Sequence, residues 1–416
     1  KKNNIDLIIC DHHKPGEELP EAFTILNPKQ EDCHYPFKEL CGCGIGLKLV
    51  QAYVEKFNLQ FNFNSLYQLA AVATAADVVP LKDENRLITY LGLKEINISP
   101  INPLKILFSN LKKEGSINIG DLIFKVAPRI NAAGRLDTAI LAADFLISDS
   151  KEAIKSLKEI EINNEDRKSL DEQTTLEAME YLNIQPIERY TNFVYSKKWH
   201  KGVVGIVASR IIEKYYKPTI VLTGHGDVIT GSARSVKDFD IYSVLDSLKH
   251  YFIRFGGHKY AAGLSLKKEN LELFKKAFED EVKKHIKKEN LFPKILIDHE
   301  LSLKTLFMDA NGQNIPKIFR IIQQMEPLGV GNPKPIFIFK NLINDSNPKI
   351  VGENHIKFQF SDVQKENTIN GIWFNSISSY DLINNKNQMD VVGSIDENIF
   401  RNQRSLQILI KDIRIV

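Results

Sequence analysis

The sequence is poor in cysteine and contains no long apolar runs. Its 416 residues include four cysteines, and all of them fall between Cys10 and Cys43. So few cysteines, so closely grouped, are no disulfide framework for a protein of this size, which favours a reducing cytoplasm. No apolar run approaches the roughly 20 residues that cross a bilayer, and the first residues lack the apolar stretch of a secretory signal. We therefore expect a cytoplasmic protein.

A strong excess of charge of one sign is also missing. The chain has 55 basic and 52 acidic residues, which gives a formal net charge of +3. Any surface that binds nucleic acid must therefore be a local basic patch. The composition is 43% hydrophobic and 26% charged, close to the globular average. At roughly 100 to 200 residues per domain, the length predicts about two to four domains.

The clustered cysteines allow two interpretations. Together with His34, the thiols of Cys33, Cys41 and Cys43 could indicate a zinc site. The pairs lack the two-residue gap that is typical of zinc-binding cysteines. Small buried thiols are therefore the favoured interpretation.

The first apolar segment ends in the tripeptide Asp11-His12-His13. The nearly continuous apolar run Ile5–Cys10 predicts a buried strand of a parallel sheet covered on both faces. The carboxyl ends of such strands line the active-site crevice, where acid and imidazole groups suit metal or phosphate chemistry. By itself the tripeptide could equally cap a turn. Because the chain starts without Met and enters this strand at once, we expect a truncated N-terminus.

Two helical patterns follow, and the second ends in a carboxylate. The glycine-containing segment Leu40–Gly46 leads into a helical pattern over Leu47–Tyr53. Farther on, the apolar helical stretch Leu69–Ala76 ends at Asp77. A buried carboxylate needs a partner, and a divalent cation is one such partner.

Several motifs resemble those of DHH-superfamily phosphoesterases of the RecJ type. In the first third of the chain they are Asp11–His13, Ala76–Leu81 and Pro128–Arg135. Later motifs resemble the DHH-associated domain and a RecJ motif near the C-terminal domain: Trp199–Arg210, Gly231–Ser235, Gly256–Gly263 and Pro327–Pro333. The resemblance runs from about Asn3 to the end, and the motifs occur in the family's order, which chance does not explain.

The resemblance implies a metal-dependent exonuclease that degrades single-stranded DNA in the 5′-to-3′ direction, in DNA repair and recombination. His12 and Asp77 would be direct ligands of Mn²⁺ or Mg²⁺, and Asp11 and His13 would orient groups or contact the substrate. Two cations would activate a water for in-line attack on phosphorus and stabilise the leaving oxygen. A repair helicase or a single-strand-binding protein would suit such an enzyme, although no segment identifies a docking site.

The family pattern also has carboxylates on two earlier strands, which this sequence does not contain. A two-metal site built only from His12, Asp77 and their neighbours would be short of ligands. We therefore expect the chain alone to bind metal poorly and to have little or no nuclease activity.

Further substrate contacts are expected after a predicted strand at Leu122–Ala127. Arg129, Asn131 and Arg135 follow this strand, and guanidinium groups bind phosphate bidentately. These residues would contact the 5′ phosphate or the DNA backbone. Alternatively, they make structural salt bridges or cap a helix that starts near Asp137.

The middle of the chain predicts a connector helix and a second α/β domain. An amphipathic pattern covers Ser150–Leu182, and its charges are interpreted as a solvated face. Gly202 and Gly205 open a helix whose free N–H groups could face an anion, and Gly256–His258 is interpreted as a turn. The resemblance implies substrate roles for His200, Ser232, Arg234, Gly256, Gly257 and His258. Turn geometry is the alternative.

The last part of the chain predicts a small β-barrel. Its expected strands are Lys294–Ile297, Ile336–Phe339, Ile356–Phe360, Ile369–Phe374, Met389–Ile395 and Leu406–Ile415. The resemblance implies an oligonucleotide-binding (OB) fold, which stacks bases on aromatic rings and pairs phosphates with basic residues. The candidates are Phe358, Trp373, Phe374, Arg401 and Arg404, and core packing is the alternative for each aromatic.

The expected fold is α/β. It has a partial DHH parallel-sheet domain at 1–149, a connector helix at 150–184, an α/β DHH-associated domain at 185–290 and an OB-type barrel at 291–416. Two other functions stay open. One is an oligonucleotide or cyclic-dinucleotide phosphodiesterase, which usually lacks such a barrel. The other is a non-catalytic DNA-binding scaffold, against which intact Asp11–His13 and Asp77 argue.

Overall fold

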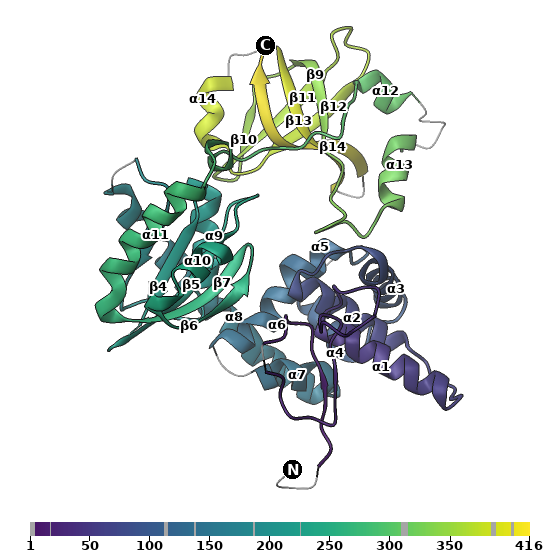
Figure 1. Ribbon diagram of the computed structural model, residues 1–416. Coiled ribbons are helices and arrows are strands. Elements are labelled where there is room, and N and C mark those ends of the chain that lie inside the picture. The colour runs from purple at the N-terminus through teal and green to yellow at the C-terminus, as the bar shows by residue number, and fades with distance from the viewer. Residues whose placement is uncertain are drawn as a thin grey trace. The chain divides into compact units, whose positions relative to one another are not determined.

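The chain divides into two compact units. The computed structural model describes residues 5–16, 18–111, 115–136, 139–185, 188–224, 226–308, 315–383, 388–400 and 403–416. One unit contains residues 1–95 and 295–416, and the other contains residues 96–294 (Figure 1). Within the described ranges, no helix is both long and apolar enough to cross a membrane.

The first unit begins with a small parallel sheet. Strands β1 (Ile8–Cys10) and β2 (Thr24–Leu26) pair in parallel, as the apolar run predicts. The prediction that this run is buried on both faces is wrong, because Ile5 is 70% exposed and Leu7 52%. Cys10 and Leu26 do pack against the apolar core. In the described part of the chain the sheet has only these two strands. A sheet this small leaves Ile5 and Leu7 exposed to solvent.

Three helices follow and form the first core. They are α1 (Gly42–Lys56), α2 (Asn64–Asp77) and α3 (Asp83–Ile98), and the helical patterns at Leu47–Tyr53 and Leu69–Ala76 are thus confirmed. The core joins α1, α2 and α3 through Leu40, Ile45, Leu47, Ala70 and Ile88. A Cβ on Gly92 of α3 would lie 2.3 Å from the carbonyl oxygen of Tyr67. Glycine therefore permits the close approach of α2 and α3.

The second unit opens with helices where a strand was expected. They are α4 (Asn102–Asn110), α5 (Ile119–Asp121), a π-helical turn (Leu122–Val126), α6 (Ala127–Leu136) and α7 (Ala139–Ile147). The strand predicted at Leu122–Ala127 is wrong. Asn118 caps this segment through a reciprocal bond with Asp121, and buried Leu122 and Val126 alternate with Phe124, which is 78% exposed. Periodicity alone cannot separate a short apolar strand from a helix. Asp137 lies outside the described residues.

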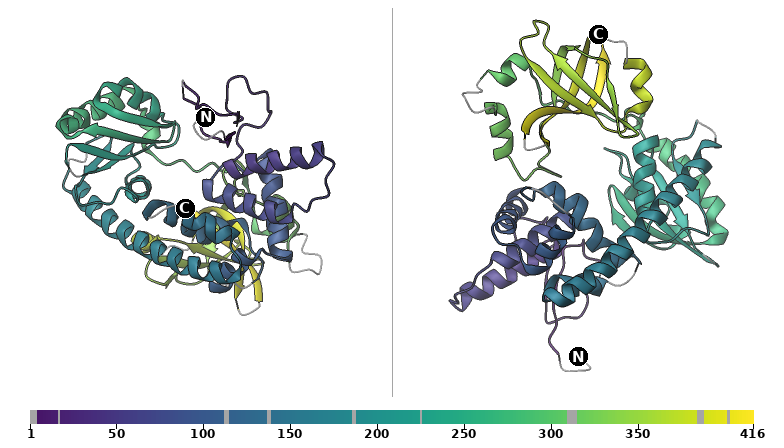
Figure 2. Two further views of the ribbon diagram at one scale, coloured as in Figure 1. Left: turned by 90° about the horizontal axis from the view of Figure 1, so that it is seen from below. Right: turned by 180° about the vertical axis from the view of Figure 1, so that it is seen from behind.

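A long helix connects these helices to a sheet. Helix α8 (Ser150–Asn183) begins after the N-cap Asp149, whose carboxylate accepts from the N–H groups of Lys151 and Glu152. Figure 2 shows α8 as one continuous helix. It packs against α4, α6 and α7 and, farther along, against α9 (Val204–Tyr215). The connector helix predicted at Ser150–Leu182 is confirmed.

The second unit continues as a five-stranded sheet with helices on both faces. Its strands, in spatial order, are β3 (Asn192–Tyr195), β4 (Thr219–Thr223), β5 (Val228–Arg234), β7 (Ala261–Lys267) and β6 (Phe252–His258). Helices α10 (Ile241–Ser247) and α11 (Leu271–His285) pack on one face. Helices α8 and α9 cover Val194 and Val221 on the other. The turn expected at Gly256–His258 is wrong, because these residues end β6.

The C-terminal strands pair in a closed order. The elements are β8 (His299–Glu300), α12 (Leu303–Phe307), α13 (Lys317–Gln324), β9 (Phe337–Asn344), β10 (Lys349–Val351), β11 (His355–Ser361), β12 (Thr368–Trp373), α14 (Tyr380–Ile383), β13 (Gln388–Phe400) and β14 (Gln403–Ile415). Strands β9, β11, β12, β14 and β13 pair successively, β12 with β14 in parallel, and β13 pairs again with β9. This order suits the predicted barrel.

The strand expected at Lys294–Ile297 is wrong. The two-residue strand β8 begins after it, at His299. Leu296 is 68% exposed, and the segment follows Pro293 without entering a described β-ladder. Because a sheet stabilises a strand through pairing and packing, a short apolar run without either stays irregular.

Candidate functional site

Two of the motifs meet at the end of β1. The Nε2 atom of His12 lies 3.4 Å from Oδ2 of Asp77, the last residue of α2. The His12 side chain is 16% exposed and the Asp77 side chain 39%. Asp77 is therefore not the buried carboxylate that the apolar pattern predicted, because it lies at the exposed end of α2. An imidazole nitrogen and a carboxylate oxygen are left facing each other at an accessible position.

The two other residues of the tripeptide bind each other. His13 Nδ1 lies 2.8 Å from Asp11 Oδ1, and the His12 and His13 rings are 4.4 Å apart. Partial desolvation raises the pKa of Asp11, but hydrogen bonds from His13 and from the backbone outweigh it and lower this pKa below its ordinary value. Asp11 is thus ionised near neutral pH and fixes the orientation of the His13 ring.

The thiols near this pair do not form a metal site in the described part of the chain. Cys41 is buried, caps α1 by accepting from Gly44 N, and lies 3.6 Å from Thr74 Oγ1. Burial raises the pKa of the Cys41 thiol, which keeps it protonated. The buried-thiol prediction holds for Cys41, whereas Cys10 and Cys33 are partly exposed and Cys43 is exposed.

His12 and Asp77 fit a divalent cation as part of a ligand set. Carboxylate oxygens suit Mg²⁺ and Mn²⁺, and imidazole is a common ligand of transition metals. The 3.4 Å separation brings both donors within reach of one ion after a small adjustment. Among the described residues, no group of three or more His, Cys, Asp and Glu side chains is arranged to hold a metal. Within the described ranges, the pair therefore offers two donor side chains for a cation.

A second group of predicted residues converges at the start of α9. Arg234 Nη1 donates to Ser232 Oγ over 2.7 Å, at the end of β5. A Cβ on Gly205 would lie 3.1 Å from Arg234 Nη2 and 3.4 Å from Ser232 Oγ. Because Gly205 has no side chain, the first turn of α9 lies directly beside the Arg234–Ser232 pair.

Arg135 and His200 complete this group. Arg135 Nη1 donates to the carbonyl oxygen of Gly202 over 3.3 Å, and Gly202 N donates to His200 Nδ1 over 3.1 Å. Desolvation, and then the nearby charge of Arg135, lower the pKa of Arg234, which nevertheless remains a cation at neutral pH. A helix N-terminus with converging guanidinium groups is chemically suited to an anion.

The sheet beside this group presents bare backbone. Ser232 on β5 pairs with Gly263 on β7, which pairs with Gly256 on β6, so the three positions share one face. A Cβ added to Gly256 or Gly263 would meet nothing within 4 Å. Arg234 and His258 lie in the next row of the same face, both opposite Ala261. We call Ser232, Arg234, Gly256, His258 and Gly263 the glycine face.

Gly257 has a different environment from its neighbour. Its φ is +157°, and a Cβ there would lie 2.3 Å from Ala261 O and 2.5 Å from Ala262 Cα. It points away from the glycine face because successive residues of a strand alternate. Glycine at position 257 therefore allows β6 and β7 to pack closely.

The remaining residues of α6 have mixed surroundings. Arg129 Nε binds Glu161 Oε1 over 2.7 Å, its Nη1 donates to Lys125 O, and its side chain is 16% exposed. Arg129 therefore makes a structural salt bridge, which was the alternative to a contact with the substrate. Asn131 is half-buried on the same helix.

A buried carboxylate near Arg135 is absent from the residues predicted by the sequence analysis. Asp171 of α8 is 1% exposed, and Arg210 Nη2 of α9 lies 2.7 Å from its Oδ2. Burial raises the pKa of Asp171, while Arg210 and Arg167 oppose this shift. A polar-looking helix pattern does not reveal which acid is buried, so Asp171 could be found only in three dimensions.

The barrel aromatics divide into buried and exposed rings. Phe358 is 2% exposed and stacks on Phe360 in the core, so its ring offers no face to a base. Trp373 pairs with buried Ile356 and Ile410 and packs against the same core. Phe374 is 51% exposed, with its ring 5.0 Å from that of His355.

The two basic candidates of the barrel lie in its last hairpin. Arg404, on β14, has an exposed side chain 3.7 Å from Glu397. Arg401 lies outside the described residues.

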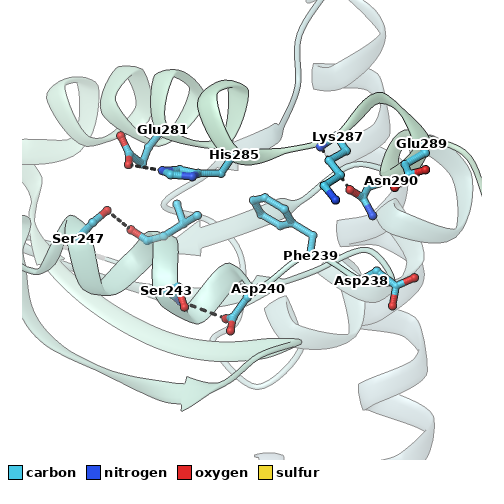
Figure 3. A pocket seen from close by; sticks show the side chains of 11 residues that line it. Asp238, Phe239, Asp240, Ser243, Ser247, Glu281, His285, Lys287, Glu289 and Asn290 are labelled. Carbon is cyan, nitrogen blue, oxygen red and sulfur yellow. Dashed lines mark hydrogen bonds and ion pairs between the residues drawn. The ribbon is translucent and has the colours of Figure 1, made fainter.

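A pocket of about 380 Å³ lies between α10 and α11 (Figure 3). It is lined by the carboxylates of Asp238, Asp240, Glu281 and Glu289, with Lys287 among them. Asp240 caps α10 through Ser243 N, and Glu281 binds His285 (Figure 3). An excess of carboxylates repels phosphate groups, so we assign no substrate contact to this pocket.

Three family models match the chain in order. The "DHH family, N-terminal domain" model matches residues 1–75, the "DHHA1 domain" model matches residues 190–284, and the "RecJ OB domain" model matches residues 300–412. The predicted fold class is confirmed by these matches.

Curated relatives are similar over nearly the whole chain. The single-stranded-DNA-specific exonuclease RecJ of Bacillus subtilis is 32% identical over 99% of this chain and 51% of the relative. The protein of the same name from Salmonella typhimurium is 32% identical over 99% of this chain and 74% of the relative. The chain thus spans about half the length of the Bacillus subtilis protein.

A crystal structure of RecJ in complex with Mn²⁺ from Thermus thermophilus has a TM-score of 0.83 at 26% identity. The superposition covers 99% of this chain and 58% of that chain. A structure of the same protein with Mg²⁺ gives a TM-score of 0.81. Similarity therefore extends to proteins that were solved with divalent cations.

Proposed function

Because the chain belongs to the RecJ family, we propose that it acts as a divalent-metal-dependent exonuclease that degrades single-stranded DNA from its 5′ end. The observation that carries the proposal is the 3.4 Å contact between His12 Nε2 and Asp77 Oδ2. Two motifs far apart in the sequence thereby place cation-binding donors side by side at the end of a strand. Phosphodiester hydrolysis is the chemistry that such donors serve in enzymes acting on DNA.

His12 and Asp77 would hold a Mn²⁺ or Mg²⁺ ion, which when bound supplies an activated water and neutralises charge on phosphorus oxygens. His12 contributes its Nε2 atom and Asp77 its carboxylate. The Asp11–His13 bond of 2.8 Å fixes the neighbouring imidazole, which is thereby ready to orient a water or a phosphate oxygen. Asp11, His12, His13 and Asp77 are the catalytic residues in this proposal.

The glycine face would hold the DNA backbone. Without side chains at Gly256 and Gly263, a phosphodiester backbone can approach the strands closely. Arg234 and Ser232, beside the first turn of α9, would bind one phosphate group, with Arg135 and His200 close to it. His258 would contact the DNA from the neighbouring row, and Gly257 would keep β6 in place.

The barrel would bind the single strand outside the reaction centre. On β11 and β12 the positions that alternate with the core carry Lys357, Gln359 and Asn370. Phe374 is the exposed ring on which a base would stack, in place of Phe358 and Trp373. Arg404 would add a phosphate contact.

We place this activity in DNA repair and recombination. An enzyme that needs unpaired DNA requires a process that produces single strands, such as the action of a helicase. A single-strand-binding protein would keep those strands open.

The test is Mn²⁺-dependent release of nucleotides from 5′-labelled single-stranded DNA. The protein encoded by the complete gene is compared with residues 1–416 alone and with His12→Ala. The control is His285→Ala, which removes an exposed imidazole on α11. We expect His12→Ala to lower the rate by more than about 100-fold, because it removes a metal ligand, and His285→Ala to leave it unchanged.

The other outcomes separate the alternatives. DNA binding without hydrolysis in the complete protein would contradict the proposal and favour a scaffold. Hydrolysis confined to short oligonucleotides or cyclic dinucleotides would favour the other phosphodiesterase class. If residues 1–416 alone are inactive but the complete protein is active, His12 and Asp77 need further ligands.

A further inference from the structure

The motif at Pro327–Pro333 forms a tight turn that the proposed function does not use. Gly329 N donates to Asn332 O over 2.8 Å, and Asn332 N donates back to Gly329 O over 3.0 Å. Gly331 has a φ of +77°, as type II turns require at their third position. The Asn332 side chain donates to the carbonyl oxygens of Met325 and Pro327. The turn is therefore fixed internally.

This turn is docked on the segment that follows Asp77. The central carbonyl of the turn, Val330 O, accepts from Leu81 N over 2.6 Å. A Cβ on Gly329 would lie 2.8 Å from Leu81 Cδ1, and a Cβ on Gly331 would lie 3.1 Å from Pro80 Cβ. Glycine at both positions therefore leaves room for the close approach, and Leu81 is 3% exposed beneath them.

A neighbouring contact holds the start of the turn. Arg86 of α3 donates through Nη2 to Met325 O over 3.0 Å. The side chain of Asn85, which is fully buried, donates to Pro80 O and to Glu39 O. The segment Pro80–Leu81 is therefore held from two sides, by Asn85 and by the turn.

The backbone between Asp77 and Pro80 is strained. Val78 has a φ of +57°, which a β-branched residue rarely adopts. Such a conformation persists only where the surrounding structure over-determines it. It ends α2 directly after Asp77, so the last turn of α2, which carries the carboxylate, stops at this residue only while Val78 keeps this conformation.

We propose that the turn Gly329–Asn332 is a positioning element for Asp77. By holding Leu81, it keeps Val78 left-handed and so fixes the Asp77 carboxylate opposite His12. The role of Asp77 in this inference rests on the proposed function. The mechanical link between the turn and Val78 does not.

The test variant is Gly331→Ala. An L-residue disfavours the positive φ of the type II turn and favours type I, in which the central peptide is turned over and Val330 O no longer faces Leu81 N. The matched control is Gly226→Ala. Gly226 has a φ of +78°, but a Cβ there meets nothing within 4 Å. Both variants place an alanine at nearly the same positive φ, and only Gly331 lies in the docked turn.

The first readout is amide hydrogen exchange over residues 76–86 of the complete protein. We expect Gly331→Ala to speed exchange there by about ten-fold, as expected for the loss of one buried hydrogen bond, and Gly226→Ala to leave it unchanged. Unchanged exchange in Gly331→Ala, or equal acceleration in both variants, overturns the proposal.

The second readout is rescue by Val78→Gly. Glycine adopts a positive φ without strain, so the Asp77 turn no longer needs the docked loop. In the Gly331→Ala background, Val78→Gly should restore Mn²⁺-dependent nucleotide release at least several-fold. If the turn only stabilises the fold, Val78→Gly should lower nucleotide release further in the Gly331→Ala background. That result would show that the positioning role is wrong.

The two readouts keep this inference separate from the proposed function. If the unaltered protein releases no nucleotides, the proposed function fails, and the exchange experiment alone decides whether the turn holds the Asp77 segment. If exchange is faster in Gly331→Ala but nucleotide release is unchanged, the turn does not position Asp77 for the reaction.

Discussion

The His12–Asp77 pair and the glycine face are built in opposite ways. At the pair, two side chains project from element ends and meet at 3.4 Å, with a strained residue directly behind Asp77. At the glycine face, side chains are missing over Gly256 and Gly263, and Ser232, Arg234 and His258 lie beside them. The donors of the first arrangement suit a cation, and the guanidinium group of the second suits an anion. The proposed reaction on a phosphodiester would need both kinds of surface, one made from side chains and the other largely from backbone.

The largest expected effect is a loss of nucleotide release without a loss of DNA binding, in Asp77→Asn. Asp77→Asn keeps the size of the side chain but removes the charge that a cation needs, so nucleotide release should fall by more than about 100-fold. Binding of single-stranded DNA, measured by fluorescence anisotropy, should change by less than about two-fold, because the proposed phosphate contacts are made by other residues. Asp246→Asn, an exposed acid of α10, is the control. An equal loss of binding and release in Asp77→Asn would remove the distinction between the two regions.

The next effect should be mainly on DNA binding, in Arg234→Ala. Arg234→Ala removes a guanidinium group from the margin of the glycine face, and a charge-assisted hydrogen bond is worth roughly 1.5–3 kcal/mol. We expect the affinity for single-stranded DNA to fall by about ten-fold or more and its dependence on salt to become weaker. Lys267→Ala removes one exposed positive charge from the far end of β7 and is the control. Equal losses in the two variants would mean that only net charge matters.

Two neighbouring glycines allow a sharper test of the glycine face. Gly257→Ala should lower the free energy of unfolding by about 1–3 kcal/mol, because its Cβ overlaps Ala261 and Ala262. Gly256→Ala should leave stability nearly unchanged, since its Cβ meets nothing, yet should weaken DNA binding several-fold by keeping the backbone of the DNA away. Urea unfolding and anisotropy measure the two quantities. A Gly256→Ala protein that binds DNA normally would contradict the proposed role of this face.

The smallest expected effect concerns Asp171, the buried acid near the arginines. Burial raises its pKa in the folded protein, so folding takes up a proton between the ordinary value of about 3.9 and the raised value. Its contribution to stability is full below that window and declines as the pH rises through it. In Asp171→Asn this decline should be absent, so the variant should gain stability relative to the unaltered protein as the pH rises. A difference in unfolding free energy that does not vary with pH would contradict this assignment.

The sequence predicted the elements that carry a strong local pattern. Helix α2 and the position of Asp77 at its end follow from the apolar run at Leu69–Ala76 and its polar boundary. The segment Leu122–Ala127 was misassigned because a run of six residues fits a strand and a helix equally well. Its helical state depends on the Asn118 cap and on the packing of Leu122 and Val126.

The sequence names candidate site residues but does not show which of them share a surface. Nothing in the sequence fixes the register that places Ser232 opposite Gly263 and Gly256, or the alternation that buries Phe358 while exposing Phe374. Both depend on which side of a strand faces the core, and one residue of shift reverses it. The burial of Asp171 and the docking of Val330 on Leu81 likewise come from tertiary packing.

An anomalous difference map from crystals of the complete protein soaked in Mn²⁺ would locate the cation directly. We expect a peak within roughly 2.0–2.6 Å of both His12 Nε2 and an Asp77 carboxylate oxygen, and its loss in Asp77→Asn. A Mn²⁺ peak that touches neither side chain, in crystals of a protein that degrades single-stranded DNA with Mn²⁺, would contradict this expectation.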